Sequence, residues 1–258
     1  EIFINNINLK SDPLKAKEYI GYLPEGAPSY SDMIVEDFLS FIGKMRGLNN
    51  NSLSNRLEEM ANQINLKEMW NRPIETLSKG FKRRVGIAQA LIHDPDILIL
   101  DEPTDGLDPN QKHEMRNLIK RISTNKAIVI STHILEEVEA VCSRAVIISN
   151  GKLLANDTPK NLENKFLNKN TLSIKVSNKI NNVFSKEIKS LLKYDDVKIQ
   201  KTDISTHTIL VSDNQKNPNL NTVLKQINKL KLDVIEANFQ KVSLEEVFRT
   251  ITSDNNSK

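Results

Sequence analysis

The chain has 258 residues, 27% of them charged, and a net charge of +3 with acids and bases intermixed. This length accommodates one α/β domain and a small second domain, the mild charge argues against a nucleic-acid binder, and no apolar run approaches the roughly 18 residues that span a bilayer. The single cysteine, Cys142, excludes an internal disulfide and is typical of a reducing compartment such as the cytoplasm.

The first six residues read as the end of a strand and its turn. No initiator methionine and no charged-then-apolar leader precedes them. A stretch of the form G-x-x-x-x-G-K-[ST], or a Gly-rich substitute for it, does not occur anywhere in the 258 residues. The backbone cradle and the lysine that such a loop offers to phosphates are therefore absent from this sequence.

A short strand is predicted at Ile20 to Leu23, and it runs into a turn that carries Glu25. Two helices are expected next, because apolar residues repeat at helical spacing from Val35 to Met45 and again from Leu53 to Ile64. Gly47 is a stop signal for the first of them.

A third amphipathic helix is predicted to continue to Leu91, and Ser78 stands where its N-cap belongs. The next residues, Lys79 and Gly80, present unpaired backbone amides at the positive end of the helix dipole. The loop is therefore suited to bind an anion.

Four apolar residues, Ile97 to Leu100, end abruptly in the adjacent carboxylates Asp101 and Glu102. A buried parallel strand reads as such a run, and open α/β sheets build their sites at the carboxyl ends of their strands. Asp101 can hold Mg²⁺ through water, while Glu102, which points to the other side of the strand, can orient or deprotonate a water that attacks a γ-phosphate. The alternative is a solvated acidic turn after a core strand.

Asp108 lies in the turn after these acids and is a predicted helix N-cap, with Pro109 at the first helical position. A second apolar strand, Ala127 to Ile130, ends in Ser131, Thr132 and His133. The other three histidines are interpreted as loop or surface residues: they are His93, His113 and His207.

The last third of the chain has a different composition. An Asn-Gly pair at Asn150 predicts a hairpin turn. Strand and helix patterns then follow in the order β-α-β-β-α-β between residues 171 and 238, which suggests a small ferredoxin-like unit. Ser243 to Glu246 reads as a capping box that starts a last helix. The many lysines in the last third of the chain are interpreted as a solvated face. The alternative is that they attract the chain to an anionic membrane surface.

These motifs together resemble the ATP-binding subunits of ABC transporters, in which a signature loop, an acidic strand end, an aspartate turn and a strand-end histidine follow in this order. The loop Leu77-Ser78-Lys79-Gly80-Phe81 is most similar to that of ATPases associated with gliding motility and of other exporters with a separate permease. In this family the segment at Glu1 comes after the phosphate-binding loop. We therefore expect an N-terminal truncation that removes this loop and ends before the family's Q-loop, which the turn at Glu25 resembles.

The resemblance implies an α/β fold of the P-loop NTPase class in its ABC form, with a mostly parallel sheet and a helical subdomain at about residues 33–92. An ATPase domain at 1–164, lacking its N-terminal part, would be followed at 165–258 by an accessory α+β domain.

Four residues receive catalytic or metal roles from the resemblance, with ATP and Mg²⁺ as the implied ligands. Asp101 would hold the metal, Glu102 would be the catalytic base, and His133 would be the switch histidine. Glu25 would contact metal and attacking water, although glutamine is usual there and a carboxylate cannot donate a hydrogen bond.

The resemblance gives a second group of residues a role at the interface between two subunits. Ser78, Lys79 and Gly80 would grip the γ-phosphate of ATP held by the opposite subunit, although Lys79 replaces a glycine and could instead point to solvent. Asp108 would cross the interface and couple the two sites.

The implied protein is a Mg²⁺-dependent ATPase that works as a homodimer or heterodimer. It would lie on the inner face of the cell membrane through transmembrane permease subunits, and it would be inactive without the phosphate-binding loop. The alternative is a catalytically inactive or regulatory subunit that pairs with an active ATPase, against which the intact Glu102 and His133 argue. An ABC ATPase that acts on ribosomes or DNA would predict tandem ATPase domains or long heptads, and the sequence shows neither.

Overall fold

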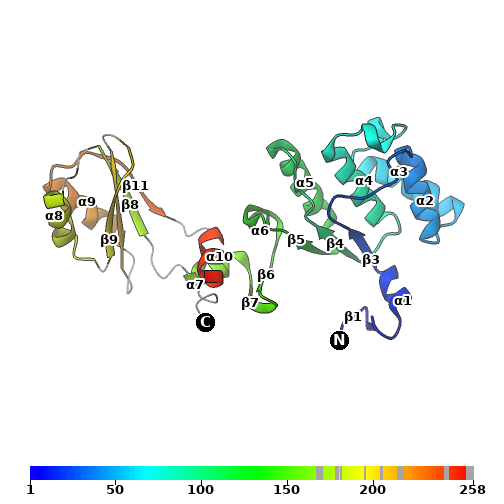
Figure 1. Cartoon of the computed structure of the whole chain (residues 1–258), viewed down its shortest axis with the longest axis horizontal. Coiled ribbons are helices and arrows are strands. Elements are labelled where there is room, and N and C mark those ends of the chain that lie inside the picture. Colours follow the sequence, from blue (N-terminus) through cyan, green and yellow to red (C-terminus); the bar gives the residue numbers. More distant parts are fainter. Residues whose placement is uncertain are drawn as a thin grey trace. The chain divides into compact units, whose positions relative to one another are not determined.

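The computed structural model describes residues 1–166, 171–177, 180, 182–194, 196–203, 206–213, 218–240 and 244–253. The chain divides into two compact units, Glu1–Val141 and Cys142–Lys258 (Figure 1). The units meet between Val141 and Cys142, earlier in the chain than the domain boundary predicted at 164/165. The predicted boundary stays a prediction.

The first unit is an α/β structure with a parallel sheet. Its elements are β1 (Phe3–Ile4), β2 (Ile7–Asn8), α1 (Pro13–Glu18), β3 (Ile20–Leu23), α2 (Val35–Met45), α3 (Asn50–Gln63), η1 (Lys67–Met69), η2 (Ile74–Thr76), α4 (Lys79–Leu91), β4 (Ile97–Asp101), α5 (Pro109–Ile122), β5 (Ala127–Ser131) and α6 (Leu135–Val141). The sheet has the order β3-β4-β5, and its strands are parallel. The predicted strands and helices of this part of the chain are confirmed.

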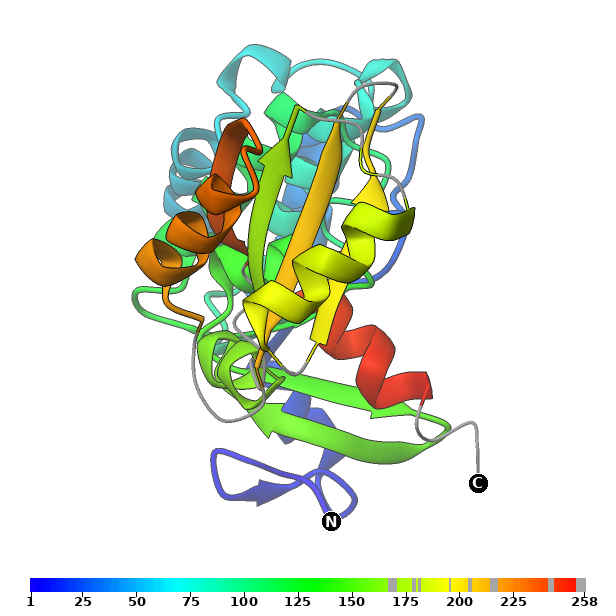
Figure 2. The same cartoon turned by 90° about the vertical axis from the view of Figure 1, so that its left-hand side faces the viewer.

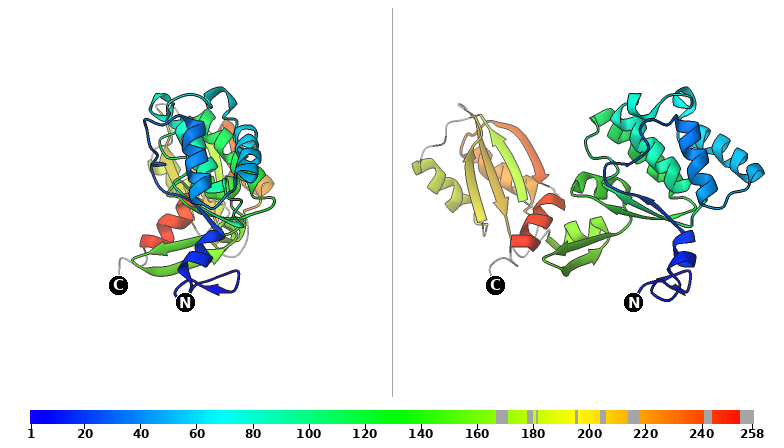
Figure 3. Two further views of the ribbon diagram at one scale, coloured as in Figure 1. Left: turned by 90° about the vertical axis from the view of Figure 1, so that its right-hand side faces the viewer. Right: turned by 45° about the vertical axis from the view of Figure 1, so that its right-hand side comes forward.

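Helix α4 connects the sheet to the helical part of the unit, because it packs against β3 on one side and α2 on the other (Figure 3). The apolar run of β4 supplies the fully buried Leu98 and Leu100 to the same core. At β3 the backbone of α4 comes very close to Gly21: a Cβ atom there would lie 2.1 Å from the carbonyl oxygen of Ala90. Only glycine fits between the helix and the strand at this position.

Strand β5 is an edge of the described sheet. It pairs with β4, and no other strand of the described residues pairs with it. Its burial alternates weakly along the strand, and Val129 is 57% exposed. This open edge contrasts with the two-sided pairing of β4.

The second unit combines a hairpin with a small α+β structure. Its elements are β6 (Ala145–Ser149), β7 (Lys152–Asp157), α7 (Pro159–Phe166), β8 (Thr171–Val176), α8 (Asn182–Leu192), β9 (Asp196–Lys201), β10 (His207–Ser212), α9 (Leu220–Lys229), β11 (Val234–Gln240) and α10 (Leu244–Ser253). Asn150 and Gly151 both have positive φ angles between β6 and β7, as the predicted hairpin requires.

The antiparallel sheet of this unit has the order β11-β8-β10-β9, with α8 and α9 packed together over one face (Figure 2). Strands and helices follow the predicted β-α-β-β-α-β order. The final helix is also present, but the predicted capping box includes Ser243, which lies outside the described residues.

His207 contradicts the interpretation as a loop or surface residue, whereas His93 lies in the turn after α4, as predicted, but is not fully exposed. His207 begins β10 and is 9% exposed, because it shares the buried side of that strand with Ile209 and Val211. His93 follows α4 and is partly buried, and its Nε2 donates to the carbonyl oxygen of Ile20 at 3.1 Å. The burial of both residues depends on tertiary packing that the local sequence does not reveal.

His93 makes the unit sensitive to acid. Burial, followed by the charge of Arg46, lowers the pKa of His93 from 6.5 to about 4, and the bond to Ile20 opposes this shift. The neutral ring therefore contributes stability that is fully present above pH 6.5, the unfolded-state value, and is lost as the pH falls toward 4. Because the ring is partly solvated, we expect a loss of about 1–2 kcal/mol.

Chemical denaturation at pH 7.5 and pH 4.5 measures this effect. The variant His93→Gln removes the titrating ring and should show a smaller loss of unfolding free energy between the two pH values than the parent. His113→Gln, on the exposed surface of α5, is the matched control and should behave like the parent. Equal pH dependence of the parent and the His93 variant would contradict the assignment.

Candidate functional site

The carboxyl ends of β4 and β5 lie side by side. They carry the acidic cluster, which consists of Asp101 and Glu102 at the end of β4 and His133 after β5. Asp101 pairs in register with Ser131. The Ser131 hydroxyl donates to Oδ1 of Asp101, and the Tyr22 hydroxyl of β3 lies 3.5 Å from Oδ2. Sequence reasoning missed both contacts, since they depend on the register of three strands. They orient the Asp101 carboxylate at the end of its strand.

Glu102 leaves the strand with an unusual backbone. Its φ angle is +46°, in the left-handed region, and its N–H donates to the carbonyl oxygen of Ser131 at 3.0 Å. A left-handed non-glycine residue costs about 1–3 kcal/mol and is concentrated at functional sites. This conformation turns the Glu102 side chain toward the end of β5.

The Glu102 carboxylate contacts His133 twice. Its Oε1 accepts from the His133 backbone N–H at 3.1 Å and from Nδ1 at 2.8 Å. Its Oε2 is buried without a hydrogen-bond partner among the described residues. The hydrogen bond and the charge of Glu102 raise the pKa of His133, whose ring is otherwise exposed.

The signature loop and the aspartate turn lie next to each other in the same unit. The Ser78 Oγ accepts from the Phe81 N–H at 3.4 Å and caps α4, while Oδ1 of Asp108 accepts from the Gln111 N–H at 2.9 Å and caps α5. Gly80 is buried so closely against Gln111 that a Cβ atom would lie 2.9 Å from its carboxamide. Both predicted N-caps are confirmed.

Lys79 leans toward this turn. A Cβ atom on Gly106 would lie 3.7 Å from Lys79 Nζ. The ammonium makes no ion pair with the residues that the structure describes. Its charge is therefore available at the exposed end of α4.

Glu25 stands apart from the acidic cluster. It is exposed in the turn after β3, where Gly26 and Ala27 have positive φ angles. Within the described part of the chain, no hydrogen bond joins its carboxylate to Asp101, Glu102 or His133. Its predicted contact with metal and water stays a prediction.

The acidic cluster fits a magnesium nucleotide better than a free metal ion. Among the described residues no group of three His, Cys, Asp or Glu side chains could hold a metal alone. Mg²⁺ commonly uses one or two carboxylates together with water and substrate phosphates. Asp101 and Glu102 are two carboxylates of this type at the end of one strand.

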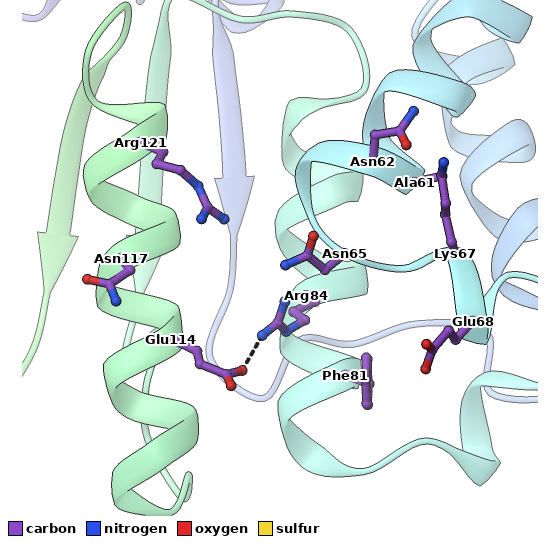
Figure 4. A pocket seen from close by; sticks show the side chains of 10 residues that line it. All are labelled: Ala61, Asn62, Asn65, Lys67, Glu68, Phe81, Arg84, Glu114, Asn117 and Arg121. Atoms are coloured by element: carbon purple, nitrogen blue, oxygen red, sulfur yellow. Dashed lines mark hydrogen bonds and ion pairs between the residues drawn. The ribbon is translucent and has the colours of Figure 1, made fainter.

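A separate pocket of about 600 Å³ lies where α3 and η1 face α4 and α5 (Figure 4). Arg84 of α4 projects into it, where it pairs with Glu114 of α5 at 2.5 Å and donates to the carbonyl oxygen of Ile64. None of the predicted site residues lines this pocket. It is thus not part of the acidic cluster.

The chain has the fold of the P-loop NTPases, as a family model and solved structures of ABC ATPase subunits show. A family model described as ABC transporter matches residues 1–105. In the described residues no helix is long and apolar enough to cross a membrane.

Similar proteins narrow the class. The linearmycin resistance ATP-binding protein LnrL of Bacillus subtilis is 30% identical over 253 residues, which cover 97% of this chain and 81% of LnrL. The ABC transporter ATP-binding protein NatA of the same organism is 34% identical over 155 residues, which cover 59% of this chain and 63% of NatA. This chain belongs to the family of ABC transporter ATP-binding proteins.

Solved structures of ABC transporter subunits are also similar to this chain. A structure described as the ATP binding subunit of an ABC transporter superposes with a TM-score of 0.55 and is 28% identical, covering 64% of this chain and 69% of that one. CbiO1 of Clostridium perfringens, described as part of the transporter complex cbiONQ, gives a TM-score of 0.58 at 26% identity, covering 63% of this chain and 67% of its own. In both cases about two thirds of each chain superposes.

Proposed function

We propose that this chain is the ATP-binding and ATP-hydrolysing subunit of an ABC transporter that drives a separate permease. The observation that carries the proposal is the double contact of Glu102 Oε1 with His133 at the carboxyl edge of the sheet. This contact orients the carboxylate and leaves Oε2 without a hydrogen-bond partner in the described residues. A general base must come within hydrogen-bond reach of the proton that it takes. Catalytic residues are thus Glu102 and His133, with Glu25 as a further candidate.

Phosphoryl transfer depends mainly on positioning and electrostatic stabilisation. Glu102 orients the attacking water and receives its proton at Oε2, while His133 holds the opposite oxygen of the same carboxylate. Asp101 is the proposed metal ligand, and Glu25 could join it after a movement of its turn. Bound Mg²⁺ would neutralise the charge that develops on the transferred phosphoryl group.

The signature loop is proposed to bind phosphate in the opposite subunit. Ser78 caps α4, which Lys79 and Gly80 begin, and Asp108 caps α5. Gly80 lies against Gln111 of α5, so the two helix N-termini are close together, and the Lys79 ammonium has no ion pair among the described residues. The hydrolytic residues of the same chain make no hydrogen bond to this loop within the described residues. A head-to-tail dimer would bring the loop of one subunit to the acidic cluster of the other.

The phosphate-binding loop is the remaining requirement. The 258 residues contain no G-x-x-x-x-G-K-[ST] stretch. We propose that a segment of the complete protein outside these residues supplies the loop, and that this chain is inactive without it. The proposed location is the inner face of the membrane, where the permease subunits would hold the dimer. The name of LnrL, a linearmycin resistance protein, supports an exporter.

Subunit mixing of the complete protein tests the dimer and the catalytic residues together. Glu102→Gln removes the base and Ser78→Arg blocks the loop, so we expect neither variant to hydrolyse ATP alone. A mixture contains dimers in which one site has the intact Glu102 of one subunit and the intact Ser78 of the other. Hydrolysis should therefore reappear on mixing.

Persistent inactivity of the mixture, with an active parent protein, would contradict the head-to-tail arrangement. An inactive parent protein that nevertheless stimulates a second ATPase subunit would favour the regulatory alternative.

A further inference from the structure

Glu137 is a buried carboxylate for which the proposed mechanism has no use. It lies in α6, is 2% exposed, and follows Glu136, which is exposed and pairs with Arg116 at 3.1 Å. Burial raises the pKa of Glu137, and its hydrogen bond from Thr132 opposes the shift. Glutamate is rarely buried to this degree unless its carboxylate is paired or hydrogen-bonded. One of its oxygens, Oε1, has no partner in the described part of the chain.

The other oxygen of Glu137 holds the turn that carries His133. The Thr132 hydroxyl donates to Glu137 Oε2 at 3.0 Å and accepts from the Ile134 N–H at 3.0 Å. Thr132 and Ile134 are the two chain neighbours of His133. Because a hydroxyl has a single proton, its donation to the carboxylate leaves its lone pairs for the backbone amide.

These bonds continue into the acidic cluster. The turn sets both the backbone N–H and the ring of His133, and both donate to Glu102 Oε1. A displacement of the turn would lengthen both bonds at once. The contacts thus form one line from Glu137 through Thr132 and His133 to Glu102.

We propose that Glu137 is a positioning residue that acts through the Thr132 hydroxyl to hold His133 against Glu102. The proposal rests on the proposed function for its effect on turnover, but its structural part concerns only the contact of His133 with Glu102. Glu137 itself touches neither of these side chains through a hydrogen bond in the described residues.

Histidine titration by NMR of the complete, nucleotide-free protein tests the structural part. Glu102 raises the pKa of His133 above that of an ordinary histidine. Thr132→Val keeps the shape of the side chain but removes the hydroxyl, and Glu137→Ala removes the acceptor. Both should therefore shift the pKa of His133 down toward its usual value. His133→Gln identifies the signal.

Conservative variants separate this role from a loss of packing. Thr132→Ser keeps a hydroxyl and should retain the raised pKa of His133. Glu137→Gln keeps an acceptor but removes the charge of Glu137, which is a minor cause of the raised pKa, so this variant should retain most of the shift. Glu136→Ala, one residue away on the exposed side of α6, is the matched control and should also retain it. If Glu137→Ala does not fold, the pair Thr132→Val and Thr132→Ser decides the question.

Steady-state hydrolysis provides the second readout. Since small displacements of catalytic groups cost up to about 100-fold in rate, we expect kcat to fall about tenfold or more in Thr132→Val, with KM for ATP changed by less than about twofold. An unchanged pKa of His133 in Thr132→Val would overturn the inference, whether or not the protein hydrolyses ATP. Absence of hydrolysis in the parent would instead count against the proposed function alone.

Discussion

The variant Glu102→Gln of the complete protein is expected to lower kcat for ATP hydrolysis by about 10²–10⁴-fold, the range that a general base contributes. The amide has nearly the same shape as the carboxylate, but it cannot take the proton of the attacking water at the position of Oε2. The left-handed backbone and the bond of its N–H to Ser131 do not depend on the side-chain charge. The variant should therefore fold normally.

ATP-dependent dimerisation separates this loss from a loss of binding. Ser78 and Gly80 are unchanged in Glu102→Gln, so we expect the variant to dimerise with ATP and Mg²⁺ and to remain dimeric because it cannot hydrolyse. Size-exclusion chromatography with light scattering measures this. Glu114→Gln, outside the acidic cluster, is the control and should turn over like the parent. Unchanged turnover in Glu102→Gln would refute the assignment of the base.

The second large effect is on stability. Gly21→Ala is expected to reduce the free energy of unfolding by about 3 kcal/mol, the upper part of the usual range for overpacking. The added Cβ would lie 2.1 Å from the Ala90 carbonyl oxygen and 2.9 Å from Pro95 Cγ. Backbone atoms and a proline ring cannot turn away as a flexible side chain can, so α4 would have to move from β3. Urea denaturation of parent and variant measures the difference.

Gly47→Ala distinguishes steric overlap from backbone preference. Gly47 has φ +84° after α2, and no atom lies within 4 Å of the position of its Cβ. Its replacement should therefore cost only the left-handed conformation, about 1–2 kcal/mol. A smaller loss in Gly21→Ala than in Gly47→Ala would show that the close approach of α4 to β3 is not a major constraint.

Much of the acidic edge could be predicted because it is encoded locally. The apolar run before Asp101 predicts the buried strand, and the end of that strand fixes where its carboxylates lie. The caps Ser78 and Asp108 follow from side chains that bond to amides three residues away. The alternation of strand and helix patterns also sufficed for the small antiparallel unit.

Contacts between elements could not be predicted in the same way. The bonds of Ser131 and Tyr22 to Asp101 depend on strand register. The left-handed backbone of Glu102 could not be predicted, because this residue is neither glycine nor asparagine, the types that commonly adopt it. Glu137 belongs to an acidic helix start, where a solvated residue is the ordinary expectation. The burial of His207 likewise depends on which face of β10 meets α8 and α9. Each of these features arises from tertiary packing.

The open side of β5 has a consequence for handling the protein. The amides and carbonyls on this side pair with no other strand in the described part of the chain, and together with the exposed Val129 they form a template onto which a strand of another molecule can add. A preparation of these 258 residues alone should therefore self-associate increasingly as its concentration rises. Replacing Val129 by lysine would place a charge on that edge and should delay the onset of aggregation.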